Sequence, residues 1–332
     1  MDPAPPLRTL YPEFAPYRVH ALPVSGGHVL HVEESGLPEG IAALVLHGGP
    51  GSGSSPLLRR FFDPARYRIV SPDQRGAGGS RPRGRTEDNT TDHLITDLEL
   101  LRDTLGIAHW LVVGGSWGAA LALAYAAAHP TAVAGLLLRA TFLARDEDVA
   151  AFFHPIGPQQ ALLPAIAHGL QGDEAPQFAL AWWRRENLRA TGHVPELEPS
   201  GDALAALIDR YRVQSHYLLH HCWLDAPPLL ERCSQLPPVP TLLLHGTDDR
   251  ICTPAASQAL HQRLPHSLLR LVDGVGHDPT HTAMVHAMVE ALDAYAARGG
   301  FDAGRAERRA APKPARVPPG DRSTYPSDEG LS

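Results

Sequence analysis

The stretch W-L-V-V-G-G-S-W-G-A-A-L-A-L-A-Y-A-A-A, residues 110–128, decides the fold of this chain. Four apolar residues are followed by G-x-S-x-G at 114–118 and by an Ala/Leu-rich run that ends before a proline. A short strand, a sharp glycine turn carrying a serine and a helix form the pattern that exposes a nucleophile above a sheet. Ser116 is therefore the candidate nucleophile. A glycine-rich turn without catalysis is the simpler alternative, and the strand–turn–helix context disfavours it.

The same alternation of short apolar runs with helical patterns extends over much of the chain. Runs that are apolar throughout are typical of parallel strands buried on both faces. Strands alternating with helices predict a mostly parallel sheet in an α/β fold. We expect strands at 28–33, 42–47, 67–72, 110–114, 133–138, 241–245 and 268–272, and helices at 91–105, 117–128 and 282–297.

The alternation stops between residues 143 and 238, where only helical patterns occur. Four helices are expected there, at 147–153, 159–170, 176–190 and 203–219. We therefore predict a core formed by residues 1–142 and 239–298, with a helical cap domain at 143–238. The Pro-rich start, to about residue 27, is expected to wrap a surface. The Arg/Pro/Gly-rich tail, 299–332, is expected to be disordered.

Composition excludes several classes of protein. Hydrophobic residues make up 43% and charged residues 20%, as in an ordinary globular chain. A net charge of −7 and a pI near 6.2 argue against nucleic-acid binding. No apolar run approaches the ~20 residues of a membrane span, and the start lacks a signal-peptide pattern. We expect a cytoplasmic protein with no membrane or nucleic-acid partner; its oligomeric state is not indicated.

Metal catalysis is disfavoured by the spacing of the metal-binding residue types. Three scattered cysteines do not form a zinc motif. His277 and His281 are four residues apart, but Pro279 lies between them and breaks the helix that such a pair would need. We therefore expect no metal and no cofactor.

The motif H-G-G-P-G at 47–51 directly follows an expected strand. Such a loop turns backbone N–H groups towards a ligand and supplies an oxyanion donor beside the residue that follows the nucleophile. Here the donors would be Gly49 and Trp117, with Gly48 as a substitute for Gly49. A tight turn is the structural alternative, and a phosphate loop is disfavoured because no G-K-[ST] follows.

A serine nucleophile needs a base and an acid that orients the base. After Ser116, one expected strand ends in G-T-D-D at 246–249 and the next in D-G-V-G-H at 273–277. Catalytic groups belong beyond the carboxyl ends of parallel strands. We assign His277 as base and Asp249 as orienting acid, with Asp248 as the rival acid. The loop D-Q-R-G-A-G-G-S at 73–80 is interpreted as structural.

From about residue 7 to residue 297 the chain resembles the proline iminopeptidase (prolyl aminopeptidase) family, serine peptidases of the α/β-hydrolase superfamily. The motifs that carry the resemblance are R-T-L-Y-P-E at 8–13, H-G-G-P-G at 47–51, D-Q-R-G-x-G-x-S at 73–80, N-T-T at 89–91 and G-G-S-W-G at 114–118. The resemblance implies an α/β-hydrolase fold, release of N-terminal proline from peptides without a cofactor, and Ser116, Asp249 and His277 as the triad.

In this family carboxylates of the cap bind the free amino terminus of the substrate. The motif W-x-x-W-E is similar to W-W-R-R-E at 182–186, which makes Glu186 the implied amine-binding acid, although Arg185 replaces a tryptophan. The motif E-x-H-Y corresponds to Q-S-H-Y at 214–217, so Gln214 replaces a carboxylate. Loss of one charge-assisted hydrogen bond would weaken amine binding roughly 10–100-fold.

Arg139 and Phe142 match positions that line the mouth of the family's active site. A solvated acid paired with a neighbouring arginine is the structural alternative for Glu186. The expected substrate is a small peptide or amide with a free N-terminus. A hydrolase for another small amide, ester or lactone is the second hypothesis, and a binding protein without catalysis the third.

Overall fold

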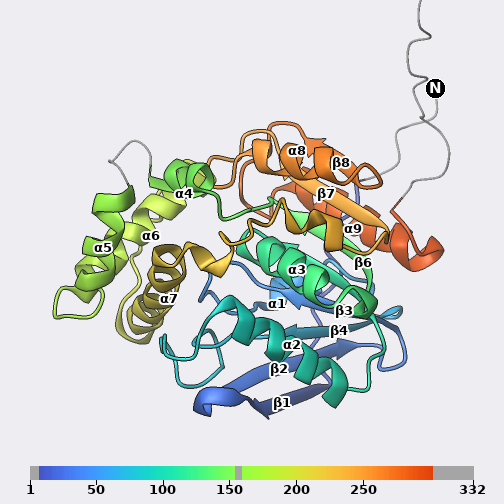
Figure 1. The fold of residues 1–332 in the computed structure, drawn as a ribbon, viewed down its shortest axis with the longest axis horizontal. Coiled ribbons are helices and arrows are strands. Elements are labelled where there is room, and N and C mark those ends of the chain that lie inside the picture. The colour runs from blue at the N-terminus through green and yellow to red at the C-terminus, as the bar shows by residue number, and fades with distance from the viewer. Residues whose placement is uncertain (1–6, 154–158, 302–332) are drawn as a thin grey trace, which may run out of the picture. The chain divides into compact units, whose positions relative to one another are not determined.

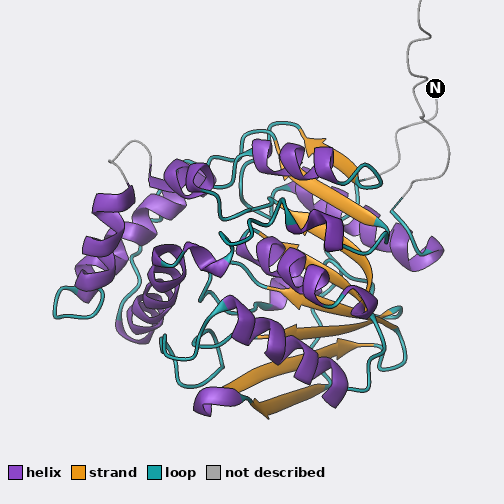
Figure 2. Cartoon of the chain, viewed as in Figure 1, coloured by secondary structure: helices purple, strands orange, loops and turns teal. Residues whose placement is uncertain are grey.

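A central eight-stranded sheet organises the part of the chain that the computed structural model describes, residues 7–153 and 159–301 (Figures 1 and 2). Its strand order is β1-β2-β4-β3-β5-β6-β7-β8. The strands from β4 to β8 in this order pair in parallel, whereas β1 and β2 are antiparallel. The strands are Arg18–Pro23, Val29–Gly36, Ile41–Leu46, Tyr67–Pro72, Trp110–Gly115, Val133–Arg139, Thr241–Gly246 and Leu268–Val272, β1 to β8. The expected mostly parallel sheet is confirmed.

Helices cover both faces of this sheet, so its inner strands are apolar on both sides. Along β3, Leu44 and Leu46 belong to the core under α2, α3 and α8, whereas Ala43 and Val45 belong to the core under α9. The helices that flank the sheet are α1 (Pro56–Arg59), α2 (Thr91–Thr104), α3 (Trp117–Ala128), α8 (Pro254–Arg263) and α9 (Thr282–Arg298). Short 3₁₀ helices lie at Ser25–Gly27, Pro130–Ala132, His221–Trp223 and Arg232–Gln235.

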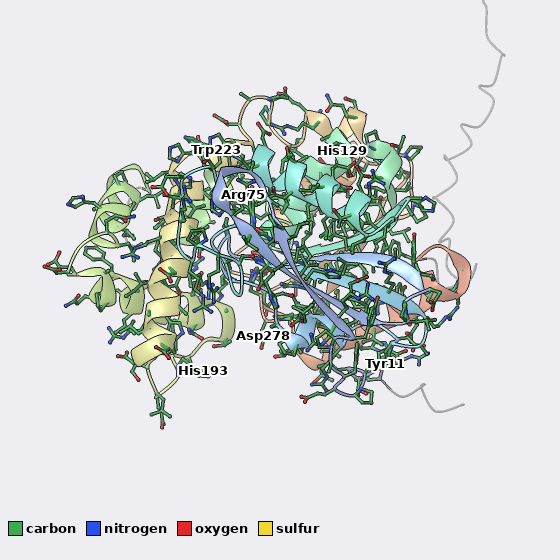
Figure 3. All side chains as sticks on the ribbon, turned by 90° about the horizontal axis from the view of Figure 1, so that it is seen from below. Tyr11, Arg75, His129, His193, Trp223 and Asp278 are labelled. Atoms are coloured by element: carbon green, nitrogen blue, oxygen red, sulfur yellow. The ribbon has the colours of Figure 1, made fainter. Side chains whose placement is uncertain are left out.

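Strand β1 corrects the expectation that the Pro-rich start only wraps a surface. Arg18–Pro23 pairs antiparallel with β2 at the edge of the sheet. Its side chains are exposed or only half-buried, so it lacks the apolar run by which a buried strand is recognised. The residues before β1 do pack on the core, since the Tyr11 hydroxyl donates to Asp293 of α9 at 2.7 Å (Figure 3).

Within the described residues, four α-helices lie between β6 and β7, where helices were expected. They are α4 (Asp146–Phe153), α5 (Gln159–Gly169), α6 (Ala175–Thr191) and α7 (Gly201–Leu219). Figure 1 draws them together at one side of the sheet, in light green to yellow. The long helices α6 and α7 pack against each other, and α7 also packs against α5. The chain returns to the sheet at β7.

The C-terminal part of the fold adds one element and refines one boundary. Helix α8 was not predicted from the sequence. Helix α9 ends, as expected, at Gly299, which takes the left-handed conformation at φ 71°. Phe301 is buried against the Tyr295 ring, with centroids 5.1 Å apart, so the chain still packs on the core at this residue, within the range expected to be disordered. Residues 302–332 lie outside the described part.

Within the described residues, no helix has both the length and the apolar character needed to cross a membrane.

Candidate active site

Ser116 lies at the apex of the turn between β5 and α3. Its backbone has φ 57° and ψ −123°, a strained conformation for a residue with a side chain. The chain also approaches itself closely here. A Cβ at Gly114 would lie 2.2 Å from the Gly118 carbonyl oxygen, and one at Gly118 would lie 2.2 Å from that of Leu46. The glycines of G-x-S-x-G are therefore required by contact with neighbouring backbone.

His277 and Asp249 meet at the carboxyl ends of β8 and β7. His277 Nδ1 lies 2.7 Å from Asp249 Oδ2, and both side chains are largely buried. Asp248, the rival acid, is exposed and accepts a hydrogen bond from the Thr247 hydroxyl at 3.1 Å. A carboxylate acceptor requires a proton on Nδ1, so Nε2 of the neutral ring is available as a base.

Asp249 is held as a carboxylate by its neighbours. The backbone N–H groups of Ile251 and Cys252 each donate to Oδ1 at 2.9 Å. Burial raises the pKa of Asp249, but the charges and hydrogen bonds of His277 and His245 outweigh burial and hold that pKa well below its usual range. The acid therefore stays ionised under any ordinary assay condition.

His245 is a second imidazole at this carboxylate, and the sequence pattern did not predict it. Its side chain is fully buried, with Nε2 3.6 Å from Asp249 Oδ2 and 2.8 Å from the Cys252 carbonyl oxygen. Its Nδ1 lies 2.7 Å from the Ser257 hydroxyl. The one available signal was a histidine at the end of a buried apolar strand, immediately before the acid loop.

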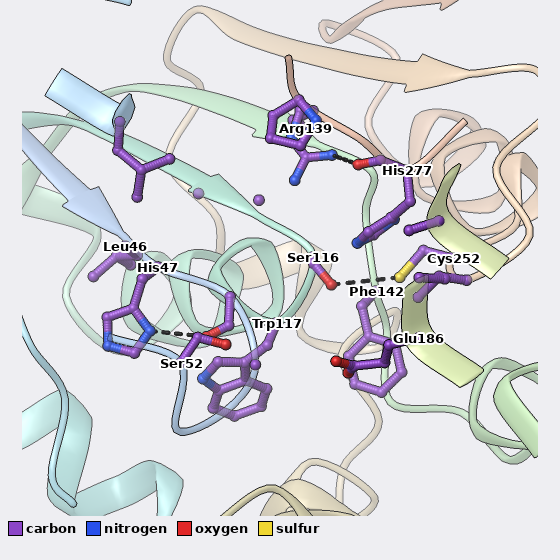
Figure 4. Close-up of a pocket in the computed structure, with 18 of the residues that line it drawn as sticks. Leu46, His47, Ser52, Ser116, Trp117, Arg139, Phe142, Glu186, Cys252 and His277 are labelled. Carbon is purple, nitrogen blue, oxygen red and sulfur yellow. Dashed lines mark hydrogen bonds between the residues drawn. The ribbon is translucent and has the colours of Figure 1, made fainter. Parts of the chain in front are cut away.

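Ser116 and His277 line one cavity of about 370 Å³ (Figure 4). The Ser116 hydroxyl lies 3.7 Å from the Cys252 thiol, and among the described residues no hydrogen bond joins it to His277. Burial raises the pKa of Cys252 well above its usual value, so this sulfur is a neutral thiol. The serine hydroxyl therefore faces a neutral thiol in this structure.

The H-G-G-P-G loop closes the cavity next to the serine. A Cβ at Gly48 would lie 3.6 Å from Ser116 Cβ, so this backbone passes directly beside the nucleophile. Gly49 has φ 116°, and a Cβ there would lie 2.8 Å from Ser52 N. Gly48, Gly49 and Trp117 all line the cavity. The three residues expected at the oxyanion hole are thus brought to one wall.

The loop 73–80 supports this wall of the cavity through hydrogen bonds of Gln74. Gln74 accepts a hydrogen bond from the Trp117 indole at 2.8 Å and donates one to the His47 carbonyl at 3.0 Å. His47 Nε2 also accepts from the Gln74 backbone N–H at 3.0 Å. Burial lowers the pKa of His47, which favours the neutral ring that this acceptor role requires. One glutamine thereby connects the Trp117 side chain with His47, the residue that begins the H-G-G-P-G loop.

The next residue of this loop, Arg75, is anchored in the core. Its guanidinium donates to both carboxylate oxygens of Asp97 at 2.7 Å, and the two side chains are 0% and 3% exposed. It also donates to the Asp88 carbonyl and to the Ser25 hydroxyl. Every branch of this buried cation is matched, so the loop is held rigidly (Figure 3).

Arg139 is the last residue of β6, Phe142 lies in the loop that follows, and both line the cavity. Arg139 Nη1 donates to the His277 backbone carbonyl at 2.8 Å. Burial lowers the pKa of this guanidinium, and the charge of Asp249 opposes that effect. Arg139 therefore contacts the backbone that carries the candidate base, a role that its expected place at the mouth of the site did not reveal.

Glu186 and Gln214 lie at the part of the cavity formed by α6 and α7. Arg210 donates to Glu186 Oε2 at 2.7 Å and the Tyr211 hydroxyl donates to the same oxygen at 2.8 Å. Gln214 Nε2 approaches Glu186 Oε1 at 3.4 Å. Glu186 is therefore not a solvated acid paired within its own helix. Its cation comes from the neighbouring helix, which sequence spacing did not indicate.

In the described ranges, 7–153 and 159–301, no group of three His, Cys, Asp or Glu side chains is arranged to hold a metal ion. His281, considered as a ligand beside His277, accepts instead from the Ala283 backbone N–H at 3.3 Å at the start of α9.

Comparisons with known proteins show the family to which the chain belongs. The model of the family described as alpha/beta hydrolase fold matches residues 43–283, and the chain belongs to that family. A probable proline iminopeptidase of Leptolyngbya boryana is 35% identical over 316 residues, covering 88% of this chain and 98% of the relative. A proline iminopeptidase of Neisseria meningitidis is 38% identical over 302 residues, covering 84% and 96%. Within the α/β hydrolases the chain belongs to the proline iminopeptidase family.

Among solved structures, a proline iminopeptidase-related protein of Thermus thermophilus matches with a TM-score of 0.57 at 25% identity. The match covers 84% of this chain and 97% of that protein.

Proposed function

We propose that this protein is a serine aminopeptidase that releases N-terminal proline from peptides through an acyl-enzyme. The observation that carries the proposal is that His277, hydrogen-bonded to Asp249 at 2.7 Å, lines the same cavity as Ser116. The names of the relatives in the family support the choice of proline.

In the first step the Ser116 hydroxyl oxygen attacks the scissile carbonyl carbon. His277 Nε2 accepts the hydroxyl proton, and Asp249 stabilises the imidazolium through the Nδ1 proton. The carbonyl oxygen becomes an oxyanion that receives hydrogen bonds from the Gly49 and Trp117 backbone N–H groups. Loss of one such donor typically reduces the rate ~10²–10³-fold.

In the second step the protonated His277 gives its proton to the leaving nitrogen, and the C–N bond breaks. The shortened peptide departs, leaving the prolyl group as an ester on Ser116. Water then attacks this ester with His277 again as base, which releases proline and restores the serine hydroxyl. No atom beyond substrate, water and the chain is needed.

The walls of the cavity suit a small apolar ring. Its volume of about 370 Å³ is near the lower end of ordinary ligand pockets. Apolar side chains contribute to its lining, among them Leu58, Phe61, Phe62, Val149, Trp183 and Ile251. Glu186 and Gln214 give the same cavity a polar end where a terminal nitrogen is bound.

The test is a comparison of L-proline anilide with N-acetyl-L-proline anilide and with anilides of other amino acids. We expect hydrolysis of the free proline compound and loss of that activity in Ser116→Ala. Equal activity on the acetylated compound would contradict the exopeptidase assignment, and preference for a different residue would contradict the assignment to proline.

A hydrolase for another small amide, ester or lactone is the second candidate. The observation that favours this candidate is the ion pair between Arg210 and Glu186 at 2.7 Å. Arg210 already occupies the carboxylate that was expected to bind the substrate's amine. A panel of aryl esters and lactones without an amine distinguishes it. Labelling of Ser116 by a fluorophosphonate would exclude a protein that only binds.

We further propose that residues 143–238 act as a cap domain over the core formed by 1–142 and 239–298. The end of α6 supports this division, because a Cβ at Gly276 would lie 3.1 Å from the Ala190 carbonyl oxygen. The inserted helices thus touch the loop of the candidate base. A cytoplasmic location stays a prediction from the sequence.

A further inference from the structure

Four side chains between α6 and α7 form what we call the amine-end cluster: Glu186, Arg210, Tyr211 and Gln214. Three of them, Glu186, Arg210 and Gln214, line the cavity that contains Ser116. Glu186 supplies one negative charge and Arg210 one positive charge, joined at 2.7 Å. The cluster as a whole therefore carries no net charge at the place where the substrate's terminal nitrogen would be bound.

Gln214 has a defined orientation within this cluster. Its NH₂ group faces the Glu186 carboxylate, with Nε2 3.4 Å from Oε1. The opposite amide orientation would set two oxygens against each other, so the hydrogen-bonding chemistry favours the observed one. Gln214 is only 5% exposed, and its Oε1 is buried without any hydrogen-bond partner among the described residues. An unmatched buried acceptor needs a donor, and in a residue that lines the cavity a ligand N–H or a water molecule can supply it.

Arg210 limits what Glu186 can offer to a ligand. One carboxylate oxygen already accepts from both Arg210 and Tyr211. The Glu186 side chain is 15% exposed and that of Arg210 is 29% exposed, so the pair is partly shielded from water and its mutual attraction is stronger than on an open surface. A cationic ligand approaching Glu186 also meets the arginine charge beside it.

Resting on the proposed function, we infer that this cluster binds the substrate's terminal nitrogen as a neutral hydrogen-bond donor to Gln214, and does not select for a positive charge. Arg210 and Gln214 are then the specificity-determining residues. The substrate class widens to small amides whose five-membered ring carries an uncharged N–H, or a CH₂ in its place, and does not extend to an acylated ring nitrogen.

The test measures binding to Ser116→Ala protein by calorimetry, so that turnover does not interfere. The two ligands are L-prolinamide and cyclopentanecarboxamide, which has the same ring and amide but a CH₂ in place of the N–H. We expect a preference for L-prolinamide below about tenfold, which corresponds to a neutral hydrogen bond.

Two substitutions then restore a charge preference by different routes. Gln214→Glu adds a carboxylate, and Arg210→Met removes the cation that offsets Glu186. Each should raise the preference for L-prolinamide about 10–100-fold. Arg184→Met is the matched control, because Arg184 lies on α6 in an exposed pair with Glu198 and should leave the preference unchanged.

A preference above about 100-fold before any substitution would overturn the inference. The inference would also be contradicted if folded Gln214→Glu protein showed the same preference for L-prolinamide as protein with Gln214. Failure of the folded protein to bind either ligand would contradict it as well. The proposed function is judged separately, by hydrolysis of L-proline anilide with Ser116 intact. Absence of that hydrolysis, with the expected shifts in binding, would reject the peptidase and keep the neutral amine-end cluster.

Discussion

The two ends of the cavity are constructed in different ways. The candidate catalytic groups follow strands of the sheet: Ser116 follows β5, Asp249 follows β7 and His277 follows β8. His277 and Asp249 are 2.7 Å apart, and backbone N–H groups hold the acid at 2.9 Å. The amine-end cluster lies on α6 and α7, where side chains alone meet across two helices.

This difference indicates which part of the site can change without loss of the fold. Substitution at a strand end disturbs backbone contacts that many residues share. Substitution on the facing sides of α6 and α7 changes the charge seen by a ligand and leaves the sheet intact. Chemistry is therefore expected to be common to the family, while recognition of the substrate nitrogen is particular to this chain.

The largest expected effect is at the nucleophile. Ser116→Ala should reduce kcat about 10⁶-fold, because no other hydroxyl replaces the attacking oxygen. The buried Cys252 thiol does not compensate, since burial raises its pKa. Steady-state hydrolysis of L-proline anilide measures the loss, and an unchanged melting temperature shows that the fold is kept. Residual activity above a thousandth of the original would contradict the role of Ser116.

Asp249→Asn should reduce kcat about 10⁴-fold, because the amide no longer stabilises the imidazolium or fixes the Nδ1 proton. Asp248→Asn is the control and should have little effect, since Asp248 is exposed and lies outside this contact. The reverse order of the two variants would make Asp248 the orienting acid.

The lowered pKa of Asp249 also predicts how stability depends on pH. Its ionised form stabilises the fold above the unfolded-state pKa of about 3.9, and that contribution is lost as pH falls towards the lower folded-state value. Thermal melting of the original protein should therefore decline more steeply below pH 4 than that of Asp249→Asn. Parallel curves would show that the carboxylate is not stabilised in the folded state.

The next effect is on the free energy of unfolding and concerns the buried ion pair of Arg75 and Asp97. Asp97→Ala leaves the Arg75 guanidinium buried without its carboxylate, which should cost about 3–5 kcal/mol of the free energy of unfolding. Glu198→Ala, in the exposed pair with Arg184, should cost at most about 1 kcal/mol. Urea unfolding measures both. Equal losses would mean that the 73–80 loop is not anchored through this ion pair.

The smallest expected effect separates positioning from substrate binding. Arg139→Met removes the hydrogen bond to the His277 carbonyl and should lower kcat roughly 10–100-fold with little change in KM. Arg139→Lys should recover part of the loss, because it keeps a cationic donor. A rise in KM at constant kcat would instead support the substrate-binding role that the sequence resemblance implies.

Local patterns were enough to predict most of the core. The strand–G-x-S-x-G–helix unit depends on neighbours within a few residues, so Ser116 was identified before any fold was known. The order of strand ends then indicated Asp249 and His277. Strand β1 was missed because an edge strand with exposed side chains has no apolar signature, and only its pairing with β2 makes it a strand.

The amine end was only partly predictable. The W-W-R-R-E pattern indicated Glu186, and Q-S-H-Y indicated Gln214, but neither pattern pointed to Arg210. Their partnership depends on how α6 and α7 pack, which places a residue 24 positions later beside the acid. The role of His245 was not predicted either. A buried histidine gives no sign of its function in the sequence, and only the structure places it beside the Asp249 carboxylate.

The sequence by itself determined the α/β architecture and predicted the candidate nucleophile and the order of the candidate acid and base, because these follow from backbone geometry over short stretches. Tertiary structure decided the charge of the amine end, the contact between Arg139 and the His277 backbone, and the thiol beside Ser116. Those features arise from side chains that are distant along the chain. Only the packing of strands and helices brings these side chains within hydrogen-bonding distance.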